Sequence, residues 1–310
     1  MNSDRMIAFV RIGAAVTAGV VALSLLSGCG GGGGGEDAAE GTVDEEVGLE
    51  GDAILDRQKR AEDFIAECMQ RQGFEYTAVN PVAQRDALLG APGLTEEEFN
   101  AQFGYGITTL FEKRLTQTAL GPNQETYDAL SAADKEAYDR TLYGEDRTAT
   151  FADALDTGDF SRLGGCLKEA TYKVFGGAAL IQDLTAKLDE LDEAILADQR
   201  MLDAVENWSD CMADEGYDFG AADDVDPFLE NKLEAIVGPV EEAKPPAPGE
   251  QPDWDPAALT TLQREEVALV KADLACEEEH IAKEEAKVRA EYEREFREKN
   301  TALLDRVPPA

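Results

Sequence analysis

The sequence is poor in the residues on which most enzyme and nucleic-acid sites depend. It has one histidine, His280, and only 28 lysine and arginine residues against 65 aspartate and glutamate residues, for a formal net charge of −37. A chain of this charge is repelled by nucleic acid and by anionic lipid headgroups, so we expect it to bind neither through a basic face. The charge is best interpreted as a solubilising surface, and it also favours cationic partners or divalent ions.

The patterns of common catalytic sites are missing as well. Gly104-Tyr105-Gly106 and Tyr143-Gly144 lack the glycine spacing of a phosphate site and predict turns. Ser131, Ser161 and Ser209 have no Gly-x-Ser-x-Gly context, and the sequence ties the histidine to none of them. Acidic residues are so numerous that no single pair of carboxylates points to a glycosidase. We therefore expect no catalytic residue and no cofactor.

A transition-metal site is not expected either. Glu277, His280 and Glu284 would share one helical face, as on a ferritin-like di-iron helix, but that site needs a second Glu-x-x-His helix. No two cysteines have the close spacing of a structural zinc site.

Calcium is the metal that the sequence leaves open. Segment 218–226 is rich in the oxygen ligands that calcium prefers, from Asp218, Asp223, Asp224 and Asp226. The spacing of an EF-hand is absent, and the same residues suit turns and helix capping. We predict these structural roles and keep calcium as the alternative.

The N-terminus has the layout of a bacterial export signal. Arg5 and Arg11 make a basic start, an uncharged run follows, and Leu26-Ser27-Gly28-Cys29 resembles a lipobox. We expect residues 1–28 to be a lipoprotein signal peptide and Cys29 to carry the lipid. Two acyl chains suffice for stable anchoring, because each buried methylene contributes about 0.8 kcal/mol. An uncleaved membrane helix is the alternative, since the apolar run is only just long enough to cross a bilayer.

The remaining cysteines agree with an oxidising compartment. After the lipobox an even number remains, which favours disulfides: Cys68, Cys166, Cys211 and Cys276. Four cysteines allow three connectivities, and their spacing alone does not choose among them.

A repeated motif bears on that choice. The pattern acid, Cys, Met, three variable residues, Gly, aromatic, acid, aromatic occurs at Glu67–Tyr76 and again at Asp210–Phe219, an offset of 143 residues between Cys68 and Cys211. We interpret this as an internal duplication. If each copy is closed by its own bridge, Cys68 pairs with Cys166 and Cys211 pairs with Cys276.

Each copy of the motif predicts a helix end followed by a short extended segment. Helical spacing of apolar residues places Cys68 on a buried stripe, and Gly73 suits the left-handed position after a helix. Phe74 and Tyr76 alternate with Glu75, which places both rings on one side of the segment. We expect the rings to cover the disulfide and close the core, with a ligand platform as the alternative.

The whole chain predicts a mainly α fold, with helical hairpins or a bundle in two related, disulfide-stapled units. Expected helices of the first unit are 53–72, 95–104, 108–120, 123–142 and 161–175, with a capping box at Thr95–Glu98. A long helix from Ile181 with Asp198 as a polar interruption, and a helix at 256–300, make up the second. Glu293 and Arg297 form one of several i,i+4 pairs that predict a solvated face on that last helix, with a protruding partner-binding helix as the alternative. The expected divisions are a lipidated, Gly-rich acidic tether at 29–52, units at 53–177 and 178–305, and a Pro-rich loop at 238–256.

The lipobox, glycine tether, paired Cys-Met-x-x-x-Gly-aromatic motifs and later partner cysteines resemble uncharacterised cell-surface lipoproteins of actinobacteria. Tyr105-Gly106-Ile107, Ala137-Tyr138 and Leu142-Tyr143-Gly144 look like recurring features of that group. The resemblance implies a location and disulfides but no known activity.

We expect a protein anchored by lipid on the extracytoplasmic face of the cell membrane, with a binding or accessory role and an envelope protein or transporter as partner. A carboxylate-dependent hydrolase of cell-wall glycan is the alternative. A ligand-binding component of an uptake system is less favoured, because such proteins show repeated α/β patterns.

Overall fold

The computed structural model describes residues 41–116, 121–150, 154, 159–247 and 249–309. Over these residues the protein is helical and has no β-strand, which confirms the expected mainly α fold. The segments that follow the two Cys-Met motifs, 74–80 and 217–219, are short non-helical connections and do not pair as strands. Within the same ranges, no helix is both long enough and apolar enough to cross a bilayer.

The chain forms two compact units, each built from segments that are separate in the sequence. The described part of the Cys211–Cys276 unit comprises residues 86–116 and 192–292. The Cys68–Cys166 unit comprises the described residues of 41–85, 121–191 and 293–309. This division differs from the expected consecutive halves 53–177 and 178–305. The difference arises because segment 86–116 packs with later helices and the C-terminal segment from Glu293 packs with the first helices.

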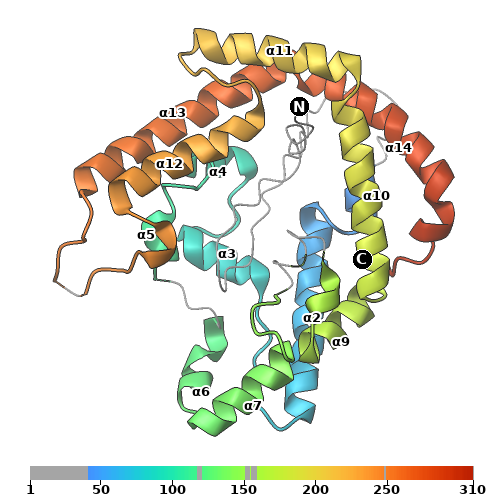
Figure 1. Cartoon of the computed structure of the whole chain (residues 1–310), viewed down its shortest axis with the longest axis vertical. Helices are drawn as coiled ribbons and strands as arrows, with labels where there is room; N and C mark the ends of the chain where they lie inside the picture. The colour runs from blue at the N-terminus through green and yellow to red at the C-terminus, as the bar shows by residue number, and fades with distance from the viewer. Residues whose placement is uncertain (1–40, 117–120, 151–153, 155–158, 248, 310) are drawn as a thin grey trace, which may run out of the picture. The chain divides into compact units, whose positions relative to one another are not determined.

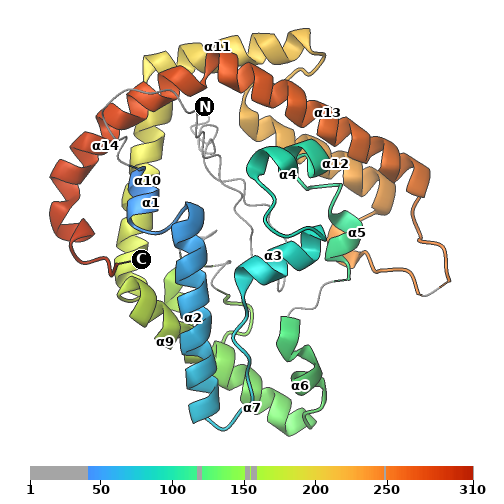
Figure 2. The same ribbon diagram turned by 180° about the vertical axis from the view of Figure 1, so that it is seen from behind.

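The Cys68–Cys166 unit is organised around α2 (Gly51–Arg71) and α9 (Gly165–Phe175), which lie side by side in Figures 1 and 2. α7 packs against both helices. The other elements of this unit are α1 (Val43–Glu46), η1 (Gly121–Asn123), α6 (Gln124–Asp128), α7 (Ala132–Tyr143) and η2 (Phe160–Arg162). Three helices carry residues of both units: α3 (Pro81–Leu89), α10 (Ala178–Leu196) and α14 (Ala282–Leu304).

A buried arginine ties the end of the chain to this unit. The guanidinium of Arg57 donates to the backbone oxygens of Val174 and Pro308, each at 2.6 Å, and lies 5.1 Å from the ring centre of Phe175. Burial, with a smaller contribution from nearby Arg60, lowers the pKa of Arg57 to about 10. Because a buried charge is costly unless hydrogen-bonded, the two carbonyls are what make this position tolerable.

The Cys211–Cys276 unit is organised around α13 (Pro256–His280). In Figures 1 and 2, α11 (Gln199–Asp214) and α12 (Val225–Val237) lie along α13, and α4 (Glu96–Phe103) also packs on it. The remaining elements are α5 (Phe111–Arg114), η3 (Ala222–Asp224) and η4 (Val240–Glu242). Buried apolar side chains from several of these elements form the core, including Phe103, Trp208, Met212, Leu229 and Leu269.

Three expected helices are interrupted, and at two of the breaks a side chain caps the start of the next helix. The expected helix 123–142 breaks after α6, and the Ser131 hydroxyl accepts from the amide of Asp134 to start α7. Asp198 is more than a polar interruption, since its carboxylate accepts from the amide of Arg200 and begins α11. The expected helix 256–300 breaks at Ile281. The capping box at Thr95–Glu98 is confirmed.

Two helices were not predicted from the sequence, α3 and α12, and one expected helix is shorter than predicted. In the expected helix 108–120, the structure places α5 at Phe111–Arg114 only, and residues 117–120 lie outside the described residues. The Pro-rich loop is present as non-helical chain between η4 and α13.

The two Cys-Met motifs end in the same helix-terminating turn. In the first, the amide of Phe74 donates to the carbonyl of Met69 at 3.0 Å, and Gly73 has φ of +89°. In the second, the amide of Tyr217 donates to the carbonyl of Met212 at 2.8 Å, and Gly216 has φ of +95°. This is the Schellman arrangement, in which glycine supplies the left-handed residue. The equivalence supports the interpretation of the motif as a duplication.

The structure joins Cys68 to Cys166 and Cys211 to Cys276, with Cα atoms 5.6 and 5.8 Å apart. This is the pairing that the duplication predicts. Each bridge links the helix that ends in a Cys-Met motif to a later helix of the same unit, α2 to α9 and α11 to α13. The units are therefore cross-linked internally and not to each other through the described cysteines.

Replacing Cys211 with serine should destabilise one unit and spare the other bridge. The lost bridge spans 65 residues, and closing a loop of that length constrains the unfolded chain by about 4 kcal/mol on the chain-entropy model. We expect the free energy of unfolding of the Cys211–Cys276 unit to fall by a few kcal/mol in denaturant titrations. Peptide mapping without reduction should find Cys276 free and the Cys68–Cys166 peptide intact. A new Cys166–Cys276 peptide would contradict the independence of the two units.

Candidate functional site

The aromatic residues of the first Cys-Met motif form the core beside its disulfide. Tyr138 is fully buried, and its ring meets Phe74 edge-on at 5.4 Å and Tyr127 at 5.3 Å between centroids. Tyr76 is also buried in the cluster that contains Cys68 and Cys166. The rings therefore cover the disulfide and close the core, as expected. The second motif is built similarly, with Phe219 stacked on Tyr217 and edge-on to Phe228.

A groove of about 490 Å³ opens beside this aromatic cluster, within the size range of small-molecule sites. Its lining comes from the turn after α2, from η1 and α6 with the residues that follow, and from α7. The lining residues are Gly73, Phe74, Glu75, Pro122, Glu125, Thr126, Ala129, Leu130 and Tyr138. Two carboxylates, Glu75 and Glu125, are the charged groups among them, and both are exposed. We call this surface the Tyr138 groove.

Tyr138, one of the lining residues, has an unsatisfied polar atom in the core. Its hydroxyl is buried and has no hydrogen-bond partner in the part of the chain that the structure describes. Burial raises the pKa of Tyr138, and the nearby Tyr143 and Glu62 raise it further, so the hydroxyl is neutral and keeps its proton. Glu62 is engaged elsewhere, since its carboxylate accepts from the Tyr76 hydroxyl at 3.1 Å and from the Val79 amide at 3.0 Å. Leaving a buried hydroxyl without a partner costs about 1 to 3 kcal/mol.

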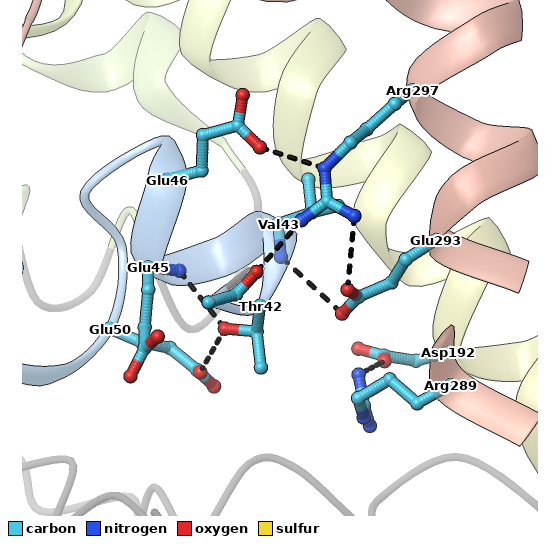
Figure 3. Close-up of polar contacts among 10 residues, drawn as sticks. Thr42, Val43, Glu45, Glu46, Glu50, Asp192, Arg289, Glu293 and Arg297 are labelled. Carbon is cyan, nitrogen blue, oxygen red and sulfur yellow. Dashed lines mark hydrogen bonds and ion pairs between the residues drawn. The ribbon is translucent and has the colours of Figure 1, made fainter. Parts of the chain in front are cut away.

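The N-terminal end of the described chain is clamped onto α14 (Figure 3). The amide of Val43 donates to Oε1 of Glu293 at 3.3 Å, and Glu293 is 4% exposed. Arg297 donates to Glu46 and to the carbonyl of Gly41, each at 2.8 Å, and also pairs with Glu293 at 3.4 Å. Val43 beneath these contacts is fully buried. We call these contacts the α1 clamp.

The α1 clamp changes the expected extent of the tether. Residues 29–52 were expected to be a flexible tether, whereas residues 41–50 are part of the folded unit and include α1. The pairing of Glu293 with Arg297 was expected as one i,i+4 pair on a solvated face. In the structure both side chains also bind the N-terminal segment. The acidic run around α1 gave no signal of this contact, because its partners lie some 250 residues later in the chain.

Two buried carboxylates hold the Cys211–Cys276 unit together. Glu266 is fully buried and accepts from the amides of Ile107, Thr108 and Thr109 at 2.7 to 3.0 Å, and also from the Thr108 hydroxyl. These bonds fix residues 107–109 on α13, which explains why segment 86–116 belongs to this unit.

The second carboxylate is Asp273. It accepts from the indole of Trp208 at 2.8 Å and from the hydroxyl of Tyr105. Burial raises the pKa of both Asp273 and Glu266, although their hydrogen bonds act in the opposite direction. The expected turn at Gly104-Tyr105-Gly106 is present in the structure, and the hydroxyl of its tyrosine is the donor to this buried acid.

The aspartate-rich segment 218–226 has the structural roles expected of it. Asp224 accepts from the amides of Gly220 and Ala221 at 2.9 and 3.1 Å, as a turn residue does. Asp218 is exposed. Over the described residues, no group of three histidine, cysteine, aspartate or glutamate side chains is arranged to hold a metal ion. The calcium alternative therefore gains no support from the geometry.

Asp226 has the most unusual environment in that segment. Burial, together with repulsion from Glu230, Glu266, Asp223 and Asp273, raises its pKa to about 6. Glu230 lies on the same helix, Asp223 on η3, and Glu266 and Asp273 on α13, so the charged form of Asp226 meets acidic side chains from three elements.

The other candidates from the sequence are structural or lie outside the described residues. The expected helical face of Glu277, His280 and Glu284 is broken at Ile281, and Glu284 pairs with Lys287. Ser131 caps α7, Ser161 bonds to Asp159, and Ser209 donates to the carbonyl of Phe219. Cys29 and the rest of residues 1–40 lie outside the described residues.

Replacing Asp226 with asparagine should stabilise the protein at neutral pH and not at pH 4. A raised carboxyl pKa means that the folded state binds the proton more tightly than the unfolded state. The resulting stability is complete below the unfolded value near 3.8 and is lost as the pH rises through about 6. Allowing for solvent screening, we expect a gain of about 1 to 2 kcal/mol at pH 7.5 in chemical denaturation. Asp218→Asn, on the exposed part of the same loop, is the control and should change stability equally little at both pH values.

Replacing Arg297 with glutamine should open the α1 clamp. Loss of charge-assisted bonds worth about 1 kcal/mol should speed hydrogen exchange at the Val43 amide roughly fivefold. Arg294→Gln, an exposed residue of the same helix, is the matched control and should leave that exchange unchanged. Equal acceleration in both variants would show that α14 as a whole, and not the clamp, had been loosened.

Comparison of the chain with protein-family models, with curated proteins and with solved structures gives no significant match. The resemblance to actinobacterial lipoproteins therefore remains a prediction from the motifs.

Proposed function

We propose that the protein is a lipid-anchored binding or accessory protein on the extracytoplasmic face of the bacterial cell membrane. The observation that carries this proposal is the use of all four cysteines after Cys29 in two disulfides within their own units. Disulfides of this kind form and persist in oxidising compartments. The lipobox-like segment at residues 26–29 supplies the route to that compartment and the site of anchoring.

The α1 clamp limits how far the anchored unit moves from the bilayer. The chain between Cys29 and the clamped Gly41 spans at most about 40 Å when fully extended. The lipid would therefore keep the Cys68–Cys166 unit, which carries both the clamp and the Tyr138 groove, within that distance of the membrane surface. The clamp makes the attachment point a fixed position on the folded unit.

The binding role is supported by the Tyr138 groove. It combines a small-ligand volume, two exposed carboxylates and the half-buried side chains of Phe74, Thr126 and Leu130. A neighbouring envelope protein or transporter remains the class of macromolecular partner that we propose. The net charge of −37 continues to argue against nucleic acid.

No specific observation favours the glycan hydrolase. The buried acids Glu266 and Asp273 have raised pKa values, as a general acid would, but each is held by several hydrogen bonds within its unit. Neither of them lines the Tyr138 groove, nor the groove of about 410 Å³ bordered by Phe103, Arg264 and Val267. We therefore do not propose catalysis.

Replacing Cys29 with serine should abolish lipid attachment. The thiol is the group that would form the thioether, so cells labelled with a fatty-acid analogue should incorporate label into the parent protein and none into the variant. The variant should also appear in the soluble fraction, since the acyl chains supply the membrane affinity. Cys68→Ser serves as the control for loss of a cysteine without loss of the anchor. Undiminished label in Cys29→Ser would refute the anchoring proposal.

A further inference from the structure

We propose that two segments of the Cys68–Cys166 unit, one from each end of the described chain, form a single latch over Arg57. Residues 41–50 are called the N-terminal strap, and residues 305–309 the C-terminal tail; both belong to this unit. A partner that binds or pulls one segment thereby loosens the other. The latch is a property of the folded unit and does not depend on the lipid proposed at Cys29.

The N-terminal strap is held at two places. Its first part is held on α14 by the α1 clamp (Figure 3), and both Val43 and Val47 are buried. Its last part passes over the guanidinium of Arg57 at Gly48, which has φ of +70°. A Cβ built on Gly48 would clash with Nε of Arg57. Glycine is therefore what allows the strap to adopt this conformation and to approach the arginine so closely.

The C-terminal tail is held by the same arginine. Nη2 of Arg57 donates to the carbonyl of Pro308 at 2.6 Å. Arg60, one turn later on α2, donates from Nη1 to the carbonyl of Pro309 at 2.8 Å. Proline has no N–H, so this part of the tail is bound through its carbonyl oxygens. Because α14 carries the α1 clamp and also leads into the tail, both segments depend on the same two helices, α2 and α14.

Arg57 can couple the two segments because its charge is fully buried. Docking of either segment requires the guanidinium to lose water and to be fixed in one conformation, and both changes cost free energy. The second segment then docks against an arginine that is already dehydrated and in place, at a smaller cost. The strap and the tail therefore dock cooperatively, and by linkage each stabilises the other by the same amount.

Hydrogen exchange of the full chain, measured by mass spectrometry of its peptides, tests the latch. Deletion of the chain from Arg306 onward should speed exchange at the Val47 and Leu49 amides of the strap, which bond within the strap itself. We expect an acceleration of about fivefold or more, the lower end of the usual coupling between two binding sites. Lys299→Gln removes an exposed ion pair of α14 and is the control, which should leave exchange in the strap unchanged.

The reciprocal experiment perturbs the strap and measures the tail. Gly48→Ala should displace the strap from Arg57 and speed exchange at the Arg306 and Val307 amides. Gly73→Ala is the matched control, because Gly73 also has a positive φ, of +89°, but a Cβ there would meet no atom within 4 Å. It introduces similar backbone strain away from Arg57 and should leave exchange in the tail unchanged.

Arg57→Met tests whether the arginine itself carries the coupling. It keeps a long unbranched side chain and removes the guanidinium. In this background, deletion of the tail should produce no further acceleration in the strap, because the shared element is already lost. If Arg57→Met does not fold, the tail deletion and Gly48→Ala still test the latch from its two sides.

Three results would overturn the proposal. Unchanged exchange in the strap after deletion of the tail would show that the two segments dock independently. Equal acceleration in α7, which packs elsewhere in the same unit, would show that the whole unit had been loosened. An undiminished effect of the deletion in Arg57→Met would show that the coupling bypasses the arginine. None of these results bears on lipid labelling at Cys29, so the anchoring proposal stands or falls separately.

Discussion

Each unit of this protein depends on one helix pair that is joined covalently at its buried face. Cys68 and Cys211 each lie one residue before the methionine at the end of a helix, and each bonds to a cysteine on a later helix, α9 or α13. In both units the following glycine reverses the chain in the same Schellman turn. In the Cys68–Cys166 unit, the residues after this turn, Phe74 and Tyr76, pack in the cluster that contains the bridge. The disulfide and the turn therefore occur in both units, and in the first unit the aromatic residues cover the bridge. The rest of each unit packs around its helix pair.

The high acid content is compatible with folding because three buried carboxylates accept hydrogen bonds that hold distant segments together. Glu266 and Asp273 draw backbone amides, an indole and a tyrosine hydroxyl onto α13, and Glu293 receives the Val43 amide of the N-terminal segment. Each of these carboxylates is reached from a segment far away in sequence. Glu266, Asp273 and Glu293 thus connect segments that are distant in sequence, and the excess negative charge stays at the surface, where solvent screens it. Asp226 departs from this pattern, since its neighbours are acidic.

Much of the local structure could be predicted from the sequence, whereas the assembly of segments could not. The Cys-Met motifs gave the helix ends, the left-handed glycines and, through their duplication, both bridges. Apolar periodicity predicted the long helices but not their breaks at Asp198, where the side chain caps the next helix, and at Ile281, where one helix ends and the next begins. The sequence also led us to expect two units that are consecutive halves of the chain. The contacts of Glu266 with residues 107–109, and of Arg57 with Pro308, cross those halves, and no short motif encodes a contact over such distances. The Tyr138 groove was hidden for the same reason, because Glu75 and Glu125 meet only after folding.

The placement of the groove and the α1 clamp in one unit links anchoring to recognition. The clamp attaches the N-terminal segment to α14, and the groove lies at the turn after α2 of the same Cys68–Cys166 unit. If Cys29 carries the lipid proposed above, the groove would stay close to the membrane, because the chain from Cys29 to the clamped Gly41 spans at most about 40 Å. The excess negative charge of the protein would then oppose contact with anionic headgroups, so the lipid and the charge would act in opposite directions on the distance between the Cys68–Cys166 unit and the bilayer.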